Sequence, residues 1–159
     1  IIFHMTDLPY GRGGSPLQNL IIRGHNETVI SAIKCVKGID AGPVYLKKPL
    51  SLVGSAEEIL IRSNQVIEDM IIDILEYDMQ PKPQSGEVVK FTRRKPDDGD
   101  WSDAKSLSEV YDYIRMLDAE GYPSAFVRVG DYKLKFSRAS RKVGSVIADV
   151  KIIKEEDHE

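Results

Sequence analysis

The stretch FHMTDLPYGRGGSP, residues 3–16, follows two β-branched residues and holds three glycines and two prolines. Glycine and proline at this density are typical of a loop, and the short apolar start predicts a strand that leads into it. A strand of this kind fits the centre of an α/β sheet, whose ligands bind beyond the carboxyl ends of its strands. We therefore expect an α/β fold with its chemistry in this loop.

The next eighty residues alternate between helix and strand signals. Residues 15–24 predict a short helix with Ser15 as its N-cap and a proline in its first turn. Residues 27–36 and 42–52 predict two strands around a turn, and Cys35 is interpreted as a small apolar side chain that faces inward. Residues 55–78 predict a long amphipathic helix, because apolar residues recur near helical spacing.

Composition divides the chain into two parts. A polar segment rich in proline and glycine, residues 81–100, predicts a linker between residues 1–80 and a small subdomain, residues 101–154. That subdomain is expected to hold one helix within residues 106–123 and about three antiparallel strands. Residues 155–159 form a charged tail.

Length and charge limit the function classes. The 159 residues suffice for one core with a smaller appendage, and the net charge of −3 does not favour a nucleic acid as the first partner. One cysteine fits a reducing, cytoplasmic setting, and no apolar run is long enough to span a membrane. The three histidines, His4, His25 and His158, lack the spacing of a metal site.

His4 and Asp40 are the candidate catalytic residues. Histidine is the side chain best suited to move a proton near neutral pH, and His4 follows the first strand directly. A carboxylate beside a histidine fixes its tautomer and stabilises its charged form, which gives Asp40 a matching role. Both residues also have an ordinary structural interpretation, His4 as a buried polar group and Asp40 as a turn former.

Nine residues in the first fifty positions follow one multi-part pattern in order. They are His4, Leu8, Pro9, Arg12, Gly13, Gly24, Thr28, Asp40 and Gly42. With these residues the chain resembles the folate-dependent formyltransferases. The segment TRRKPDDGDW, residues 92–101, is similar to the entry into the carboxyl-terminal subdomain of the methionyl-tRNA and sugar formyltransferases.

The resemblance implies a fold and a reaction. The fold is the C-terminal part of a Rossmann-like domain followed by a small β-rich, OB-like subdomain. The reaction transfers a formyl group from 10-formyltetrahydrofolate to an amine. His4 and Asp40 then assist proton movement. Residues expected to bind the acceptor are Thr6, Asp7, Arg12 and Gly13, and those expected to bind the folate are Leu8 and Gly42.

Two positions depart from the family pattern. Ile2 stands where the family has an asparagine that holds the formyl oxygen, and the loss of one such donor typically costs about 10² to 10³ in rate. Three interpretations of this departure are open. Thr6 or Asn19 supplies another hydrogen-bond donor to the formyl oxygen, protonated His4 takes that role, or the domain has lost its activity. Asp7 stands where the family has an apolar residue. Its carboxylate is a candidate to bind a cationic or amino substrate or to shift the protonation of His4, and the alternative is that it only caps or forms a turn.

The family's folate-binding half precedes the histidine strand. A chain that begins at Ile1 is therefore expected to lack the early strands and to be inactive alone. The apolar sheet edge left open favours association, so a homodimer is a candidate assembly.

The acceptor is expected to be small. Residues 101–159 hold 10 Lys and Arg against 11 Asp and Glu, which favours an amino nucleotide-sugar over a tRNA. Arg12 is a candidate for contact with the diphosphate of such a sugar, or for support of its own loop. A domain that binds a nucleotide or sugar without catalysis is the alternative. A methionyl-tRNA formyltransferase is a further one, supported by the basic triplet at residues 93–95.

Overall fold

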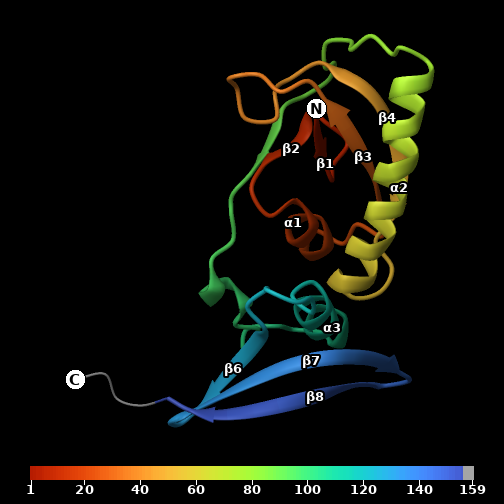
Figure 1. Ribbon diagram of the computed structural model, residues 1–159. Coiled ribbons are helices and arrows are strands. Elements are labelled where there is room, and N and C mark those ends of the chain that lie inside the picture. The colour runs from red at the N-terminus through yellow and green to blue at the C-terminus, as the bar shows by residue number, and fades with distance from the viewer. Residues whose placement is uncertain (156–159) are drawn as a thin grey trace. The chain divides into compact units, whose positions relative to one another are not determined.

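The protein is described by a computed structural model over residues 1–155 (Figure 1). It forms two compact units. Unit 1 comprises residues 1–53 and 58–94, and unit 2 comprises residues 54–57 together with the described residues from Lys95 on. The short segment 54–57 thus belongs to unit 2, although unit 1 flanks it in sequence.

The sheet of unit 1 has three strands, β1 (Ile2–His4), β3 (Glu27–Ile33) and β4 (Val44–Ser51). Their order is β1-β3-β4 and both pairs are antiparallel, with His4 opposite Ser31. The prediction of two strands around the Asp40 turn is confirmed. Among the described residues the first strand lies at the edge of this sheet, and the central position expected for it in the complete domain stays a prediction. These antiparallel pairs establish a mixed α/β unit.

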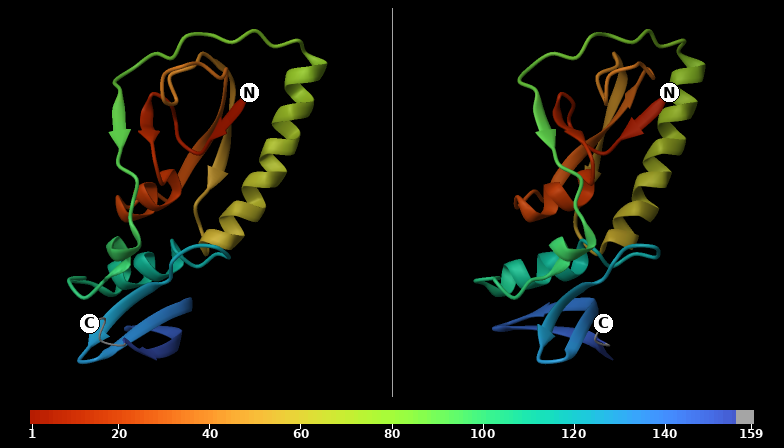
Figure 2. Two further views of the ribbon diagram at one scale, coloured as in Figure 1. Left: turned by 60° about the vertical axis from the view of Figure 1, so that its left-hand side comes forward. Right: turned by 90° about the vertical axis from the view of Figure 1, so that its left-hand side faces the viewer.

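A second pairing brings distant parts of unit 1 together. β2 (Tyr10–Gly13) lies parallel to β5 (Val89–Phe91), as Figure 2 shows. Segment 81–94 thereby packs with unit 1 over the glycine-rich loop, although we expected a linker there. Phe91 contributes to this docking, because its side chain is buried and its ring packs edge-to-face with the Tyr10 ring, with 5.4 Å between the ring centroids.

Both predicted helices of unit 1 are present. α1 (Pro16–Ile22) begins with the expected proline. Ser15 does not cap the helix with its side chain, because its backbone is left-handed and its hydroxyl accepts a hydrogen bond from the Arg94 backbone N–H at 3.0 Å. Docking of segment 81–94 has therefore replaced the local capping bond.

The long helix α2 (Ala56–Glu76) lies along β4, where Lys48 pairs with Asp73 at 2.6 Å (Figure 1). Its inner face buries Ile59, Met70 and Ile74, as the periodicity predicts, whereas Ile71 and Leu75 of the same apolar pattern are exposed. The core of unit 1 also takes the following apolar residues from α1, β3, β4 and the loops: Leu8, Leu17, Leu20, Ile21, Ile30, Ala32, Ile33, Leu50 and Leu52.

Cys35 corrects one prediction. It lies beyond the end of β3, in the turn that leads to Asp40, and it is exposed. The alternation that pointed it inward does not continue past Ile33, because the strand ends there.

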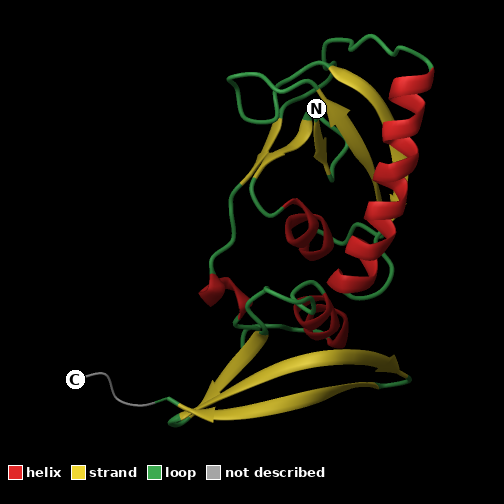
Figure 3. Cartoon of the chain, in the orientation of Figure 1, coloured by secondary structure: helices red, strands yellow, loops and turns green. Residues whose placement is uncertain are grey.

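Unit 2 has the predicted composition of one α-helix and three antiparallel strands, preceded by the short 3₁₀ helix η1 (Pro96–Gly99) (Figure 3). The α-helix is α3 (Leu107–Arg115), and the strands are β6 (Ala125–Val129), β7 (Tyr132–Lys142) and β8 (Ser145–Lys154). The strand order is β6-β7-β8, so the described residues form an open sheet. The expected charged tail, residues 155–159, lies outside the described residues apart from Glu155.

Within residues 1–155, no helix has the length and apolar character needed to cross a membrane. The same part of the chain contains no group of three or more His, Cys, Asp or Glu side chains arranged to hold a metal ion.

Candidate active site

His4 lies at the end of β1 and is buried. Its Nε2 lies 2.8 Å from the carbonyl oxygen of Gly11 in the loop that follows. Because a carbonyl oxygen only accepts, Nε2 carries the hydrogen in this arrangement. The other ring nitrogen, Nδ1, faces the Asp40 carboxylate, with 3.7 Å between Nδ1 and Oδ2. The structure thus brings together the two residues for which the sequence predicts proton transfer.

Asp40 occupies a constrained position in the β3–β4 turn. Its φ of 47° is left-handed, a conformation that aspartate tolerates better than most residues. Its Oδ2 also accepts a hydrogen bond from the Gly13 backbone N–H at 2.8 Å. One carboxylate oxygen therefore joins the glycine-rich loop to the turn and also faces the histidine.

Gln84 holds this turn from the other side. Its Nε2 donates to the carbonyl oxygens of Asp40 and Gly42 at 2.7 and 2.8 Å. Its Oε1 accepts from the Arg12 guanidinium at 2.7 and 3.1 Å. Arg12 therefore supports its own loop in this structure. Sequence reasoning missed Gln84, because a lone glutamine in a proline-rich segment carries no local signal.

Two glycines of the family pattern have no room for a side chain. A Cβ at Gly42 would lie 1.8 Å from the Lys34 carbonyl oxygen, and one at Gly13 would lie 2.3 Å from the Phe91 carbonyl oxygen. Both are below any contact that a real Cβ makes, so these positions require glycine. Leu8, the other residue expected to bind folate, lies in the core. Gly13 and Gly42 have no side chain and that of Leu8 is buried, so none of these three residues offers a side chain to a ligand.

The neutral donors proposed to replace the asparagine are both engaged with the backbone. Thr6 is fully buried, and its hydroxyl donates to the Gly11 carbonyl oxygen at 3.4 Å. The Asn19 amide nitrogen lies 2.9 to 3.1 Å from three carbonyl oxygens, those of Gly14, Ser15 and Thr92. These side chains fix the loop around α1.

Asp7 lies on the outer side of the loop. Its carboxylate is 2.5 Å from the Lys47 ammonium, which also donates to the Leu8 carbonyl oxygen at 2.6 Å. The carboxylate is therefore partly neutralised by its own chain, and Asp7 also lines a pocket.

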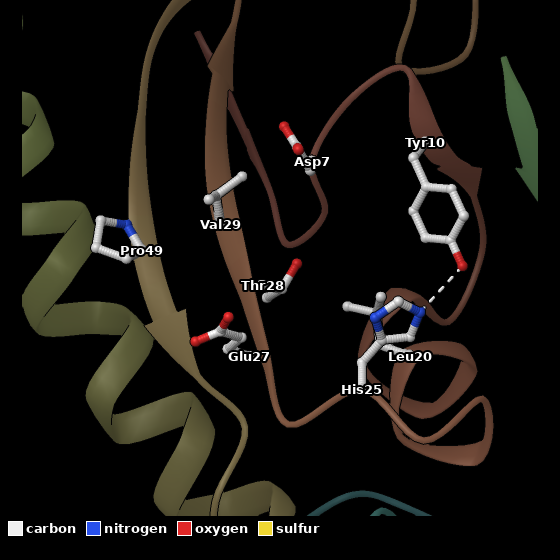
Figure 4. A pocket seen from close by; sticks show the side chains of 8 residues that line it. All are labelled: Asp7, Tyr10, Leu20, His25, Glu27, Thr28, Val29 and Pro49. Atoms are coloured by element: carbon white, nitrogen blue, oxygen red, sulfur yellow. Dashed lines mark hydrogen bonds between the residues drawn. The ribbon is translucent and has the colours of Figure 1, made fainter. Parts of the chain in front are cut away.

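That pocket, of about 440 Å³, is open to solvent (Figure 4). Its lining residues are Asp7, Tyr10, Leu20, His25, Glu27, Thr28, Val29 and Pro49. The Tyr10 hydroxyl and His25 Nε2 are 3.1 Å apart and form one wall, while Glu27 and Asp7 supply carboxylates. Such a lining suits a polar ligand with amine or hydroxyl groups. Sequence reasoning did not select Tyr10, His25 or Glu27, because they share no strand face or motif.

Comparisons with known proteins show which family the chain belongs to. A sequence profile of the methionyl-tRNA formyltransferase C-terminal domain matches residues 96–153. The structure of the methionyl-tRNA formyltransferase from Clostridium thermocellum superposes with a TM-score of 0.93 at 56% identity, over 96% of this chain and 67% of that one. The chain belongs to the folate-dependent formyltransferase family.

Curated relatives of the family are more distant. The methionyl-tRNA formyltransferase of Gluconobacter oxydans is 29% identical over 86% of this chain, and that of Clavibacter sepedonicus is 30% identical over 88%. The chain covers 45% and 47% of these two proteins, so it spans less than half of their length.

Two remoter structures share the fold. HypX from Aquifex aeolicus in complex with tetrahydrofolic acid has a TM-score of 0.66 at 17% identity, over 87% of this chain and 25% of that one. The sugar 3N-formyl transferase WlaRD has a TM-score of 0.56 at 15% identity, over 99% of this chain and 65% of that one. At these identities the likeness concerns architecture.

Proposed function

We propose that this chain forms part of a formyltransferase that moves a formyl group from 10-formyltetrahydrofolate to the amine of methionyl-tRNA. The observation that carries the proposal is the 56% identity to the Clostridium thermocellum enzyme over nearly the whole chain. The profile match over unit 2 supports the same acceptor. These findings favour methionyl-tRNA over the amino nucleotide-sugar that the charge balance favours.

The proposed chemistry uses His4 as the proton acceptor. Attack of the amine nitrogen on the formyl carbon forms a C–N bond, places negative charge on the formyl oxygen and leaves the nitrogen with a proton to lose. With Nε2–H bonded to Gly11, the nitrogen free to take that proton is Nδ1. The Asp40 carboxylate, 3.7 Å away, then stabilises the imidazolium. Collapse of the intermediate breaks the bond between the formyl carbon and the folate nitrogen, that nitrogen takes the proton from His4, and tetrahydrofolate and the formylated amine are released.

The same histidine is our candidate for the role of the missing asparagine. The side chains of Thr6 and Asn19 already donate hydrogen bonds to backbone carbonyl oxygens. When the proton passes to His4 in step with C–N bond formation, the positive charge of the ring builds up beside the oxyanion while the oxyanion develops. In this concerted step His4 takes the place of the donor that Ile2 lacks.

Folate enters as the formyl donor. The residues expected to contact it, Leu8 and Gly42, shape the loop and the turn rather than present side chains. We propose that donor contacts come mainly from residues outside this chain, in a Rossmann-like domain that unit 1 helps to complete. From its membership of this family, we further propose that unit 2 is OB-like and that the protein is cytoplasmic.

An amino nucleotide-sugar stays the second candidate acceptor. The balanced charge of residues 101–159 offers few unopposed cations for the phosphates of a tRNA. A small diphosphate needs fewer of them, and the polar pocket beside Asp7 is of a size that suits a sugar.

The test is formyl transfer by the full-length protein, with methionyl-tRNA and a panel of amino nucleotide-sugars as acceptors. We expect formyl-methionyl-tRNA as product, and a loss of about 10² to 10⁴ in kcat for His4→Ala. The exposed helix variant Asn64→Ala serves as the matched control and should keep full activity. Formylated product from amino nucleotide-sugars but not from methionyl-tRNA would overturn the proposal that methionyl-tRNA is the acceptor. Folate binding without product from any amine would indicate a domain without catalysis.

A further inference from the structure

The two ring nitrogens of His4 face two different acceptors. Nε2 lies 2.8 Å from the Gly11 carbonyl oxygen, and Nδ1 lies 3.7 Å from Oδ2 of Asp40. A neutral imidazole carries one hydrogen on nitrogen, so the two acceptors compete for it. Only the first distance is that of a hydrogen bond, and the hydrogen is therefore on Nε2. The tautomer that leaves Nδ1 free to take a proton thus depends on where the Gly11 carbonyl group is held.

The Gly11 carbonyl group is held by Thr6. The Thr6 hydroxyl donates to the same carbonyl oxygen at 3.4 Å. A Cβ at Gly11 would lie 2.7 Å from Cγ2 of Thr6 and 2.8 Å from an atom of the Phe91 ring, closer than real Cβ atoms come to their neighbours. Gly11 is thus enclosed between Thr6 and Phe91, so a displacement of Thr6 would displace the acceptor of the His4 hydrogen.

Thr6 is in turn fixed by Ser31 of the neighbouring strand. Ser31 lies directly opposite His4 in the pairing of β1 with β3, so the two side chains are on one face of the sheet. The Ser31 hydroxyl donates to the Thr6 carbonyl oxygen at 2.7 Å and accepts from the Leu8 backbone N–H at 3.4 Å. Ser31 is fully buried, so its bonds are not exchanged for bonds to water.

Lys47 holds the same loop from the solvent side. It lies opposite Ser31 in the pairing of β3 with β4, and its ammonium donates to the Leu8 carbonyl oxygen at 2.6 Å. The side chain of Lys47 is exposed, so water can replace this bond. Of the two strand residues that hold the loop, the buried Ser31 therefore has the stronger influence on its position.

We propose that Ser31 is a positioning residue that sets the tautomer of His4. The proposal rests on the proposed function, in which Nδ1 takes the amine proton. Ser31 holds Thr6, Thr6 holds the Gly11 carbonyl group, and this group keeps the ring hydrogen on Nε2. When the first bond is lost, the Gly11 carbonyl group moves away from Nε2, and the Asp40 carboxylate attracts the hydrogen to Nδ1. A nitrogen that already carries a hydrogen cannot accept the amine proton.

Ser31→Ala in the full-length protein tests the proposal by two measurements. Nitrogen-15 NMR of the histidine rings at about pH 8, where imidazoles are mostly neutral, shows which ring nitrogen carries the hydrogen. The spectrum of His4→Gln identifies the His4 signals. We expect the hydrogen on Nε2 in the wild type. In Ser31→Ala the fraction of this tautomer and the kcat for methionyl-tRNA should fall by the same factor, about tenfold, while the KM for the acceptor stays unchanged.

Ser63→Ala is the matched control. Ser63 is also a buried serine of unit 1, 2% exposed, and its hydroxyl donates to the Leu60 carbonyl oxygen of α2 at 2.7 Å. The control should leave the tautomer and kcat unchanged. Thr6→Val removes the hydroxyl that holds the Gly11 carbonyl group but keeps the size of the side chain. It should shift both quantities in the same direction as Ser31→Ala, and it tests the proposal even where Ser31→Ala folds poorly.

The outcomes separate this proposal from the proposed function. A wild type that makes no formyl-methionyl-tRNA would overturn the proposed function, whereas the NMR signals would still report the tautomer. Far-UV circular dichroism verifies that the variants fold. The role of Ser31 would be overturned by a hydrogen on Nδ1 in the wild type, by an unchanged tautomer in folded Ser31→Ala or in Thr6→Val, by a kcat that does not follow the tautomer, or by an equal loss in Ser63→Ala.

Discussion

At the scale of single residues, Asp40 and Gln84 show how a turn can contribute to the proposed reaction centre. Asp40 faces His4 and accepts from Gly13 with the same oxygen, so its position depends on a turn held in a left-handed conformation. Gln84 donates to the carbonyl oxygens on both sides of that turn. The carboxylate is thus positioned by Gln84 through the backbone of the turn.

We expect Gln84→Ala to lower kcat while the KM for the acceptor changes little, because the aspartate loses its alignment. The two carbonyl oxygens also lose their donors, which costs about 1 to 3 kcal/mol of stability. Gln84→Glu keeps an acceptor for Arg12 and loses the donors, so it should resemble the alanine variant in kcat. Steady-state kinetics and urea titration measure both effects, and a kcat equal to the wild type would contradict the positioning role.

Asp100 makes the stability of unit 2 depend on pH in the acid range. Burial raises the pKa of Asp100, but hydrogen bonds from Ser102 and the charges of Arg128 and Lys133 outweigh this effect and hold the pKa below its ordinary value of 3.8. The stabilisation is therefore complete above pH 3.8 and is lost as the pH falls through the lowered pKa. Urea titrations should show Asp100→Asn less stable than the wild type at pH 6, with the difference shrinking below pH 3.8.

At the scale of elements, capping shows where local sequence suffices. In α3, Ser106 accepts from the Glu109 backbone N–H at 3.1 Å, and the Glu109 carboxylate accepts from the Lys105 backbone N–H at 2.8 Å. Ser106→Ala should cost about 1 kcal/mol in the free energy of unfolding, and Ser106→Thr much less. Equal costs for both would show that the hydroxyl does not cap the helix.

Helices and hairpins were predictable because their signals are local. Periodicity in residues 55–78 predicts α2, and the Gly130–Asp131 and Val143–Gly144 turns separate β6, β7 and β8 as expected. The failures come from contacts that are distant in sequence. Ser15 loses its capping role to Arg94, and Gln84 reaches Arg12 across 72 residues. His4 and Asp40 could be paired from the sequence only through the family pattern, because no periodicity relates a strand end to a turn.

At the scale of the whole molecule, the two units are interleaved along the chain. Segment 54–57 belongs to unit 2, where Arg115 donates to the Gly54 carbonyl oxygen at 3.0 Å and Glu57 N–H donates to the Asp118 carbonyl oxygen at 3.0 Å. Ala56 is fully buried. A single domain boundary placed in the proline-rich segment would assign residues 54–57 to unit 1. Composition changes only at the proline-rich segment, so it does not indicate that the chain also enters unit 2 at residues 54–57.

Residues 95–159 expressed alone should therefore be less stable than unit 2 in the intact chain. The buried Arg115 would lose an acceptor, which costs about 1 to 3 kcal/mol. We expect amides of β6, β7 and β8 to exchange with solvent deuterium roughly tenfold faster in the fragment, because their protection follows local stability. Equal protection in fragment and chain would mean that segment 54–57 contributes nothing to unit 2.

The position of Gln84 also sets an order for assembly. The turn at Asp40 receives its donors from a residue 44 positions later. As the chain emerges from a ribosome, β1, its pairing with β3 and the turn at Asp40 are made first, but the two donors that hold the carbonyl oxygens of this turn come only with the segment that contains Gln84. The proposed reaction centre is thus completed late in the synthesis of unit 1, and a nascent chain stopped before residue 84 has His4 and Asp40 without the side chain that holds the turn.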